Sequence, residues 1–234
     1  MSLTQLQSDF FKLKNPAKAE IFQRFFKTGP GEYGEGDVFL GLTVPQQRQL
    51  VKKHKDLDFL ALQKLLQNKI HEYRLVALLI LVEQFGKADE NKQRQVFNFY
   101  LKNTSHINNW DLVDLSAPKI IGAYLLSKKP ERKTLYQLAK SSNLWEKRIA
   151  ILATYTFIKN GELEDTLKIS EILLKDKHDL IHKAVGWMLR ELGKIDQNLE
   201  EQFLQKYGKQ IPRTMLRYAI EKFEESKRQY YLKL

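Results

Sequence analysis

The sequence contains no cysteine among its 234 residues. This absence excludes disulfide bonds, zinc ribbons and thiol catalysis, and it fits a reducing compartment. Long apolar runs are lacking as well, because the longest aliphatic stretch, residues 76–82, is far too short to span a bilayer. The N-terminal residues lack the apolar core of a signal peptide. We therefore expect a soluble, cytoplasmic protein without a membrane partner.

Positive charge is what the chain has in excess. Its 39 Lys and Arg residues oppose 28 Asp and Glu residues, which gives a formal net charge of +11 and a pI of about 9.5. A basic enzyme with no charged partner would be compatible with these values. Phosphate is nevertheless the commonest anion that selects for a basic face, so the composition favours a nucleic-acid partner over a membrane surface.

Helical periodicity covers nearly the whole chain. Apolar residues recur at spacings of three and four, for example over residues 57–66 and 149–157, and no stretch alternates with period two for long enough to predict a strand. The pattern predicts an all-α protein of about a dozen helices with short connections. Helix breaks are expected at Asn15-Pro16, loop 28–37, Lys129-Pro130, Asn160-Gly161 and Ile211-Pro212.

Four segments of the chain can be placed in register. They start at Arg74, Asp111, Arg148 and Lys183, at intervals of 37, 37 and 35 residues, and each reads charged, apolar, apolar, variable, apolar. Repeats of this length predict an α-solenoid of HEAT-like helix pairs, a single domain over residues 1–234 with a concave, basic DNA-binding surface. A plain helical bundle would give a similar coincidence over four short segments.

Asp114 departs from the pattern of the repeats. Its position is held elsewhere by Ala77, Ile151 and Gly186, which are small or apolar. A buried, lone carboxylate is costly unless it is paired or partly wet, and such local violations concentrate at functional sites. Two interpretations stay open, a functional acid and a structural bridge to a neighbouring Arg or Lys. Trp187 departs in a similar way, since the other repeats carry leucine there.

Two short motifs point to other chemistries but lack the required context. Residues 29–34 match G-x-G-x-x-G, yet a helix is expected before them, and Glu32, Glu35 and Asp37 would repel phosphates. A surface turn is therefore favoured over a nucleotide site. Residues 178–182, His-Asp-Leu-Ile-His, imitate a zinc-binding H-E-x-x-H motif without a third ligand in evidence. We expect no metal and no organic cofactor.

Three ordered motifs resemble the AlkD-like DNA alkylation repair family. They are Trp110-Asp111-Leu112-Val113-Asp114, Leu144-Trp145-Glu146-Lys147-Arg148 and Ala184-Val185-Gly186-Trp187-Met188-Leu189-Arg190-Glu191. Residues 39–45 also look like the F-x-G-[IL]-x-x-P motif of the family. The resemblance covers about residues 15–225 and implies an α-solenoid of HEAT-like helix pairs, in agreement with the repeats.

The resemblance implies a monofunctional DNA glycosylase. Such an enzyme excises cationic purines alkylated at N3 or N7 from double-stranded DNA, without drawing the base into a deep pocket. Trp110, Asp114, Arg148 and Trp187 would form the active site, with the carboxylate close to the deoxyribose, the indoles around the nucleotide and the guanidinium on a phosphate. We expect a monomer whose phosphate contacts come from Lys27, Arg74, Arg148, Lys183, Arg190, Arg213 and Arg217.

The sequence also departs from the family pattern in two places. Phe25 stands where well-known members carry a tyrosine, and loop 28–37 extends the connection to the F-x-G motif. This loop is either a flap that presents Tyr33 near the damaged nucleotide or a surface turn. Two other functions stay open, DNA binding without base excision and a protein-interaction scaffold. The intact Asp, Arg and Trp set favours the enzyme over the first, and the charge and Asp114 favour it over the second.

Overall fold

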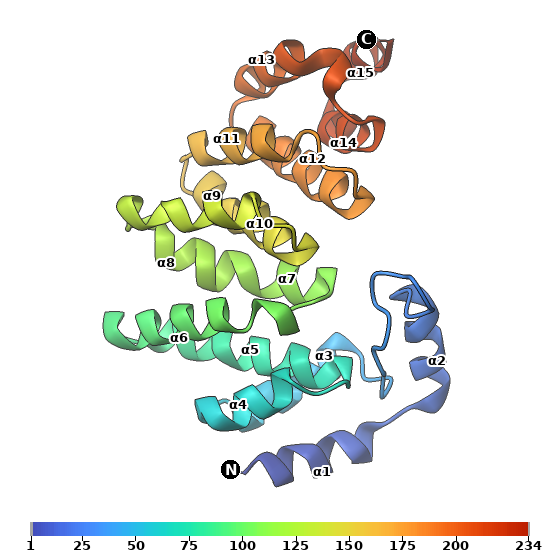
Figure 1. The fold of residues 1–234 in the computed structure, drawn as a ribbon, viewed down its shortest axis with the longest axis vertical. Coiled ribbons are helices and arrows are strands. Elements are labelled where there is room, and N and C mark those ends of the chain that lie inside the picture. The colour runs from blue at the N-terminus through green and yellow to red at the C-terminus, as the bar shows by residue number, and fades with distance from the viewer. Residues whose placement is uncertain (1, 234) are drawn as a thin grey trace. The chain divides into compact units, whose positions relative to one another are not determined.

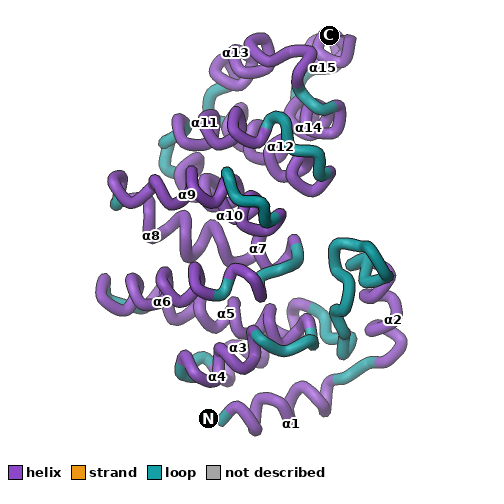
Figure 2. Tube along the Cα trace, viewed as in Figure 1, coloured by secondary structure: helices purple, strands orange, loops and turns teal. Residues whose placement is uncertain are grey.

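The computed structural model describes residues 2–233, which are helical almost throughout (Figure 1 and Figure 2). Within this range no β-strand forms, and a single isolated bridge joins Val38 to Ile70. The all-α prediction is confirmed. No helix among residues 2–233 combines the length and the apolar character needed to cross a membrane. The α-helices are α1 (Leu3–Leu13), α2 (Pro16–Phe25), α3 (Val44–His54), α4 (Phe59–Leu66), α5 (His71–Lys87), α6 (Glu90–Lys102), α7 (Trp110–Ala117), α8 (Ala123–Leu126), α9 (Lys133–Ala139), α10 (Leu144–Lys159), α11 (Glu164–Leu173), α12 (Asp179–Gly193), α13 (Gln197–Tyr207), α14 (Arg213–Ala219) and α15 (Glu225–Lys233).

Shorter helical segments link several of these helices. A π-helical segment, η2 (Pro118–Gly122), continues α7 directly into α8. The remaining short segments are 3-10 turns, η1 (Thr104–His106), η3 (Lys129–Arg132), η4 (Gly208–Gln210) and η5 (Ile220–Lys222).

The chain divides into two compact units, Met1–Ser116 and Ala117–Leu234. In the first unit α5 packs against α3, α4 and α6. In the second unit α10 packs against α9, α11 and α12, and α12 packs in turn against α13 and α14. Successive helix pairs therefore stack within a unit, as a solenoid-like fold requires (Figure 1). The single domain over residues 1–234 expected from the sequence stays a prediction.

Helix starts follow local sequence signals. Asn15 caps α2 by accepting a hydrogen bond from the amide of Lys18 at 3.0 Å, and Pro16 occupies the first turn, where no backbone donor is needed. The expected breaks at Asn160-Gly161 and Ile211-Pro212 are confirmed as the end of α10 and the start of α14. Side-chain caps also begin α4, α6, α10 and α13, at Asp58, Asp89, Asn143 and Asp196.

The four segments placed in register lie on α5, α7, α10 and α12. At the position shared with Asp114, the other three repeats are buried, whereas Asp114 itself is half-buried. The first position of the register is charged in every repeat, yet Arg74, Asp111 and Arg148 are only 5%, 7% and 5% exposed. These buried charges must be satisfied by partners inside the protein.

Candidate active site

Trp110 begins α7 and lies half-buried against phenyl rings of the first unit. Its indole stacks on Phe26 with ring centroids 5.3 Å apart and planes 19° apart, and it meets Phe25 edge-on at 6.0 Å. Phe26 in turn stacks on Phe39 at 5.1 Å. Phe25 is 61% exposed, so an aromatic surface continues from Trp110 to the solvent. Such a surface can stack on a planar or cationic base.

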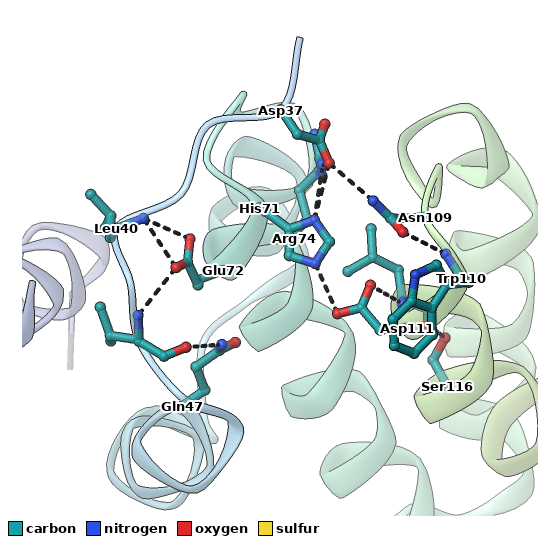
Figure 3. Close-up of polar contacts among 12 residues, drawn as sticks. Asp37, Leu40, Gln47, His71, Glu72, Arg74, Asn109, Trp110, Asp111 and Ser116 are labelled. Carbon is teal, nitrogen blue, oxygen red and sulfur yellow. Dashed lines mark hydrogen bonds and ion pairs between the residues drawn. The ribbon is translucent and has the colours of Figure 1, made fainter. Parts of the chain in front are cut away.

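A buried polar network lies next to these rings (Figure 3). His71 at the start of α5 bonds through Nδ1 to Asp37 at 3.0 Å and through Nε2 to Asp111 at 2.8 Å. Arg74, one turn further along α5, pairs with Asp37 at 2.6 Å. Burial alone would lower the pKa of His71, but the charge and hydrogen bonds of Asp111 and Asp37 outweigh it and raise that pKa to about 9.

The same network holds the first turn of α7. Asn109 accepts a hydrogen bond from the amide of Trp110 at 2.8 Å, and its own side-chain amide donates to Asp37 at 3.5 Å. Asp111 accepts from the amide of Leu112 at 2.9 Å with the oxygen that His71 does not use. Loop 28–37, α5 and α7 are thus joined beneath Trp110 (Figure 3).

Asp114 follows one turn after Trp110 on the same helix and is half-buried. Its neighbour Tyr100 is fully buried and shares a hydrogen bond of 2.9 Å with Ser116. Burial raises the pKa of Tyr100, and the negative charge of Asp114 raises it further. Asp114 is therefore a partly accessible carboxylate whose negative charge helps to keep the buried phenol of Tyr100 neutral.

The other two expected active-site residues belong to the second unit. Arg148 on α10 is buried and donates from Nη1 to the backbone carbonyl of Leu180, in the first turn of α12, at 2.6 Å. Trp187 on α12 is half-buried, with its indole 6.2 Å from the ring of Tyr155 on α10. Trp110 and Asp114 lie on one helix of the first unit, and Arg148 and Trp187 lie on neighbouring helices of the second.

Most of the expected phosphate contacts lie at the protein surface. Lys183 is half-buried and pairs with Asp179 at 2.8 Å, and Arg190 pairs with Glu221. Both cations are partly neutralised, so a phosphate would compete with a carboxylate for them. The fully surface-exposed members of the set are Lys27, Arg213 and Arg217.

Arg74 is the expected phosphate contact that the structure places deepest in the first unit. Its guanidinium lies against Asp37, and only 5% of the residue is exposed. Little of its surface is left for a phosphate. The role visible for Arg74 is to neutralise a buried carboxylate.

Loop 28–37 folds back on its own backbone. Glu32 accepts from the amide of Gly29 and Glu35 from the amide of Gly31, each at 2.9 Å. Gly34 is buried, and a Cβ atom there would stand 2.5 Å from the carbonyl of Phe26. The expectation that Asp37 would repel phosphates is wrong, because this carboxylate is buried and paired with two cationic groups.

His71 is the residue of this region that the sequence did not reveal. Asp37 lies 34 residues before it and Asp111 lies 40 residues after it, so no local spacing links the three. One signal was present: His71 precedes Arg74 by three residues, which places both on one face of the first repeat helix. Their shared partner became visible only in the fold.

The helix pairs that stack within each unit define an all-α protein with a solenoid-like fold. The chain belongs to the DNA alkylation repair enzyme family, whose model matches residues 6–223. No curated protein matches the sequence. A solved structure described as a predicted DNA alkylation repair enzyme from Enterococcus faecalis is similar, with a TM-score of 0.70 and 19% identity over 91% of this chain and 97% of that one. At this identity the likeness shows the all-α, solenoid-like fold.

Proposed function

We propose that the protein is a monofunctional DNA glycosylase that hydrolyses the N-glycosidic bond of purines alkylated at N3 or N7 in double-stranded DNA. The observation that carries the proposal is Asp114, a partly accessible acid at a repeat position that is otherwise small or apolar. It follows Trp110 on the same helix in a chain of net charge +11. Membership of a DNA alkylation repair family supports this reading.

The chemistry suits a carboxylate. Alkylation gives the purine a positive charge, so the base leaves as a neutral molecule and takes the electron pair of the glycosidic bond with it. Positive charge then develops on the deoxyribose, and a nearby carboxylate stabilises this transition state. A water molecule adds its oxygen to the anomeric carbon, and Asp114 takes up the released proton before passing it to solvent.

Aromatic rings and cations complete the proposal. Trp110, backed by Phe26, and Trp187 would supply indole faces for cation–π attraction, each worth about 0.5–2 kcal/mol. Arg148 would hold a backbone phosphate through its guanidinium, in addition to its bond to the carbonyl of Leu180. Exposed cations would contact phosphates further away, namely Lys27, Arg213 and Arg217.

The test is release of free base from duplex DNA that carries one N7-methylguanine or one N3-methyladenine. We expect the wild-type protein to release the base, and Asp114→Asn to lower the rate roughly ten- to a thousand-fold while DNA affinity stays near that of wild type. Asp56→Asn, an exposed acid of the same unit, is the matched control and should keep full activity. Excision by Asp114→Asn at the wild-type rate would remove this carboxylate from the mechanism.

Binding of branched or damaged DNA without excision is the second candidate function. The burial of Arg148 favours this candidate. Its guanidinium donates to the carbonyl of Leu180, and this structural role does not depend on base excision. This candidate predicts tight, salt-dependent DNA binding and no free base from either substrate. A protein-interaction scaffold, by contrast, predicts DNA affinity that does not change with salt.

A further inference from the structure

His71 is bound on all sides by the first unit. Its two ring nitrogens face the carboxylates of Asp37 and Asp111, at 3.0 and 2.8 Å. Its ring faces meet two phenyl groups, Phe39 at 4.6 Å with planes 23° apart and Phe26 at 4.9 Å with planes 36° apart. The side chain is 2% exposed. Both ring nitrogens and both faces of the imidazole are therefore in contact with other side chains.

This geometry favours a protonated ring. A neutral imidazole has a single N–H, so one of its two nitrogens would turn a lone pair towards a carboxylate oxygen. Carboxylates only accept hydrogen bonds, so the contacts to Asp37 and Asp111 are both hydrogen bonds only when each ring nitrogen of His71 carries a proton. An imidazolium supplies both donors, and with Arg74 it balances the two buried negative charges.

The partners of His71 are the segments that present the candidate catalytic groups. Asp111 lies directly after Trp110 in the first turn of α7, and Asp114 follows three residues later on the same helix. Asp37 ends loop 28–37 and also receives the side-chain amide of Asn109, the residue before Trp110. Phe26 packs at a tilt against the imidazole and stacks on the indole of Trp110. A change at His71 thus reaches Trp110 through the polar contacts of Asp37, Asn109 and Asp111 (Figure 3), and also through the ring of Phe26.

We propose that His71 is a positioning residue, whose imidazolium ties loop 28–37 to the first turn of α7 and so holds Trp110 and Asp114 in the orientation that base excision needs. The inference rests on the proposed glycosylase function for its activity readout. Its structural part, the tie between His71 and α7, can be measured without any substrate. His71 itself reaches no reacting atom in this role.

The tie should respond to pH. The charged groups that face His71 are Asp37 from the loop, Asp111 from α7 and Arg74 from α5, while residues 26 and 39 contribute only phenyl rings. Together the two carboxylates raise the pKa of His71 to about 9, against the opposing effect of burial. A raised histidine pKa means that the tie is intact below this pH and is lost as pH rises through it.

The experiment uses Trp110 as a reporter. The chain has three tryptophans, so the double variant Trp145→Phe, Trp187→Phe leaves Trp110 as the sole indole. Its emission and its quenching by acrylamide are followed from pH 6 to pH 10 with and without His71→Gln, which has a donor at one end only. Base release and DNA affinity are measured near pH 7 in the chain that keeps all three tryptophans.

His54 provides the matched control. It is another buried histidine of the first unit, 1% exposed, and it bonds to the carboxylate of Asp9 at 3.0 Å on α1. His54→Gln removes a buried imidazole and a carboxylate contact without altering the groups around Trp110. A loss of stability alone would therefore be common to both variants, whereas a positioning effect would be confined to His71→Gln.

We expect the Trp110 signal to change with a midpoint near pH 9 in the reporter protein, and to lack this midpoint after His71→Gln. We also expect kcat for base release to fall at least tenfold in His71→Gln, with DNA affinity within about twofold of wild type. His54→Gln should keep the wild-type midpoint and kcat. Should His71→Gln fail to fold, Asp37→Asn replaces it and should move the midpoint to lower pH.

Two results would overturn the inference: a Trp110 signal that is the same in His71→Gln and wild type at every pH, or an unchanged kcat in His71→Gln. A wild-type protein that releases no base would instead refute the proposed function. In that case the pH midpoint of the Trp110 signal, measured with and without His71→Gln, is the remaining test of whether His71 positions α7.

Discussion

Gly186 on α12 lies against the backbone of α14, so that a Cβ atom at this position would stand only 2.4 Å from the carbonyl oxygen of Met215. The Cβ of Tyr218 would be nearly as close, at 2.5 Å. Neither neighbour is the end of a flexible side chain, so the two helices would have to move apart. The glycine that shares the repeat position of Asp114 is thus explained by close helix packing.

Gly186→Ala should destabilise the protein. Alanine gains up to about 1 kcal/mol in helix propensity, but the clash with α14 costs about 1–3 kcal/mol or more, so the clash should win. Denaturant unfolding measures the difference. The control is Gly86→Ala near the end of α5, where an added Cβ meets nothing within 4 Å and stability should hold or rise. Equal stabilities of the two variants would contradict the packing argument.

Glu72→Gln should destabilise the first unit. The buried carboxylate of Glu72 accepts hydrogen bonds from the backbone amides of Leu40, Gly41 and Leu42, at 3.0, 2.7 and 3.2 Å (Figure 3). Oε1 accepts all three bonds and Oε2 shares the one from Leu40, so glutamine would lose the negative charge of the acceptor and turn its NH2 group towards the amide of Leu40. We expect a loss of roughly 2–3 kcal/mol in the free energy of unfolding. Glu20→Gln on the exposed face of α2 should change it by less than about 0.5 kcal/mol.

Stability should fall with rising pH because of Glu200. Burial raises the pKa of this carboxyl to about 8, with help from Glu201, and its Oε1 has no hydrogen-bond partner among the described residues. The folded state therefore keeps a proton that the unfolded state releases above its ordinary pKa of 4.5. Between these two values the contribution of Glu200 decreases by up to about 1.4 kcal/mol per pH unit.

Glu200→Gln should remove this pH dependence and leave the protein more stable than wild type near pH 8. Melting temperatures recorded from pH 5 to pH 8 check it, with the exposed Glu224→Gln as the control that keeps the wild-type slope. Parallel curves for all three proteins would show that Glu200 is ionised in the folded state.

DNA affinity should depend steeply on salt if exposed cations hold phosphates. Arg217→Gln is expected to weaken binding to any duplex and to flatten the plot of log affinity against log salt by about one unit. Lys168→Gln removes the same charge from a side chain that pairs with Glu164 at 2.6 Å, and should leave the slope unchanged. Identical slopes for both variants would place Arg217 outside the DNA interface.

Helix positions could be predicted from the sequence because their signals are local. Asn15 and Pro16 mark the start of α2 through a cap and a missing donor, and both lie within the turn that they specify. The repeat register likewise placed Asp114 on the same kind of helix as Ala77 and Ile151. Its partial exposure fits the prediction of an acid that could not be fully buried.

The partners of buried charges could not be predicted, since the fold brings them together from distant parts of the chain. Arg74 was expected at the surface and instead neutralises Asp37, which itself was expected to be an exposed acid of the loop. The F-x-G motif is explained in the same way. Gly41 adopts a φ of 87° with its amide on Glu72, a residue about 30 positions later in the sequence.

The buried charges at the start of each repeat have a consequence for modularity. Asp111 depends on His71 of the preceding repeat, and Arg148 depends on Leu180 of the following one. Excising one repeat, or transplanting it into another array, would separate the pair of His71 and Asp111 or remove the carbonyl of Leu180 from Arg148, and breaking a buried ion pair typically costs several kcal/mol. Consensus repeats can be added or deleted as interchangeable units. Here each repeat carries a buried charge whose partner differs from one repeat to the next, so the repeats are not interchangeable. Such an array can diversify residue by residue, but it cannot change its length by simple duplication or loss.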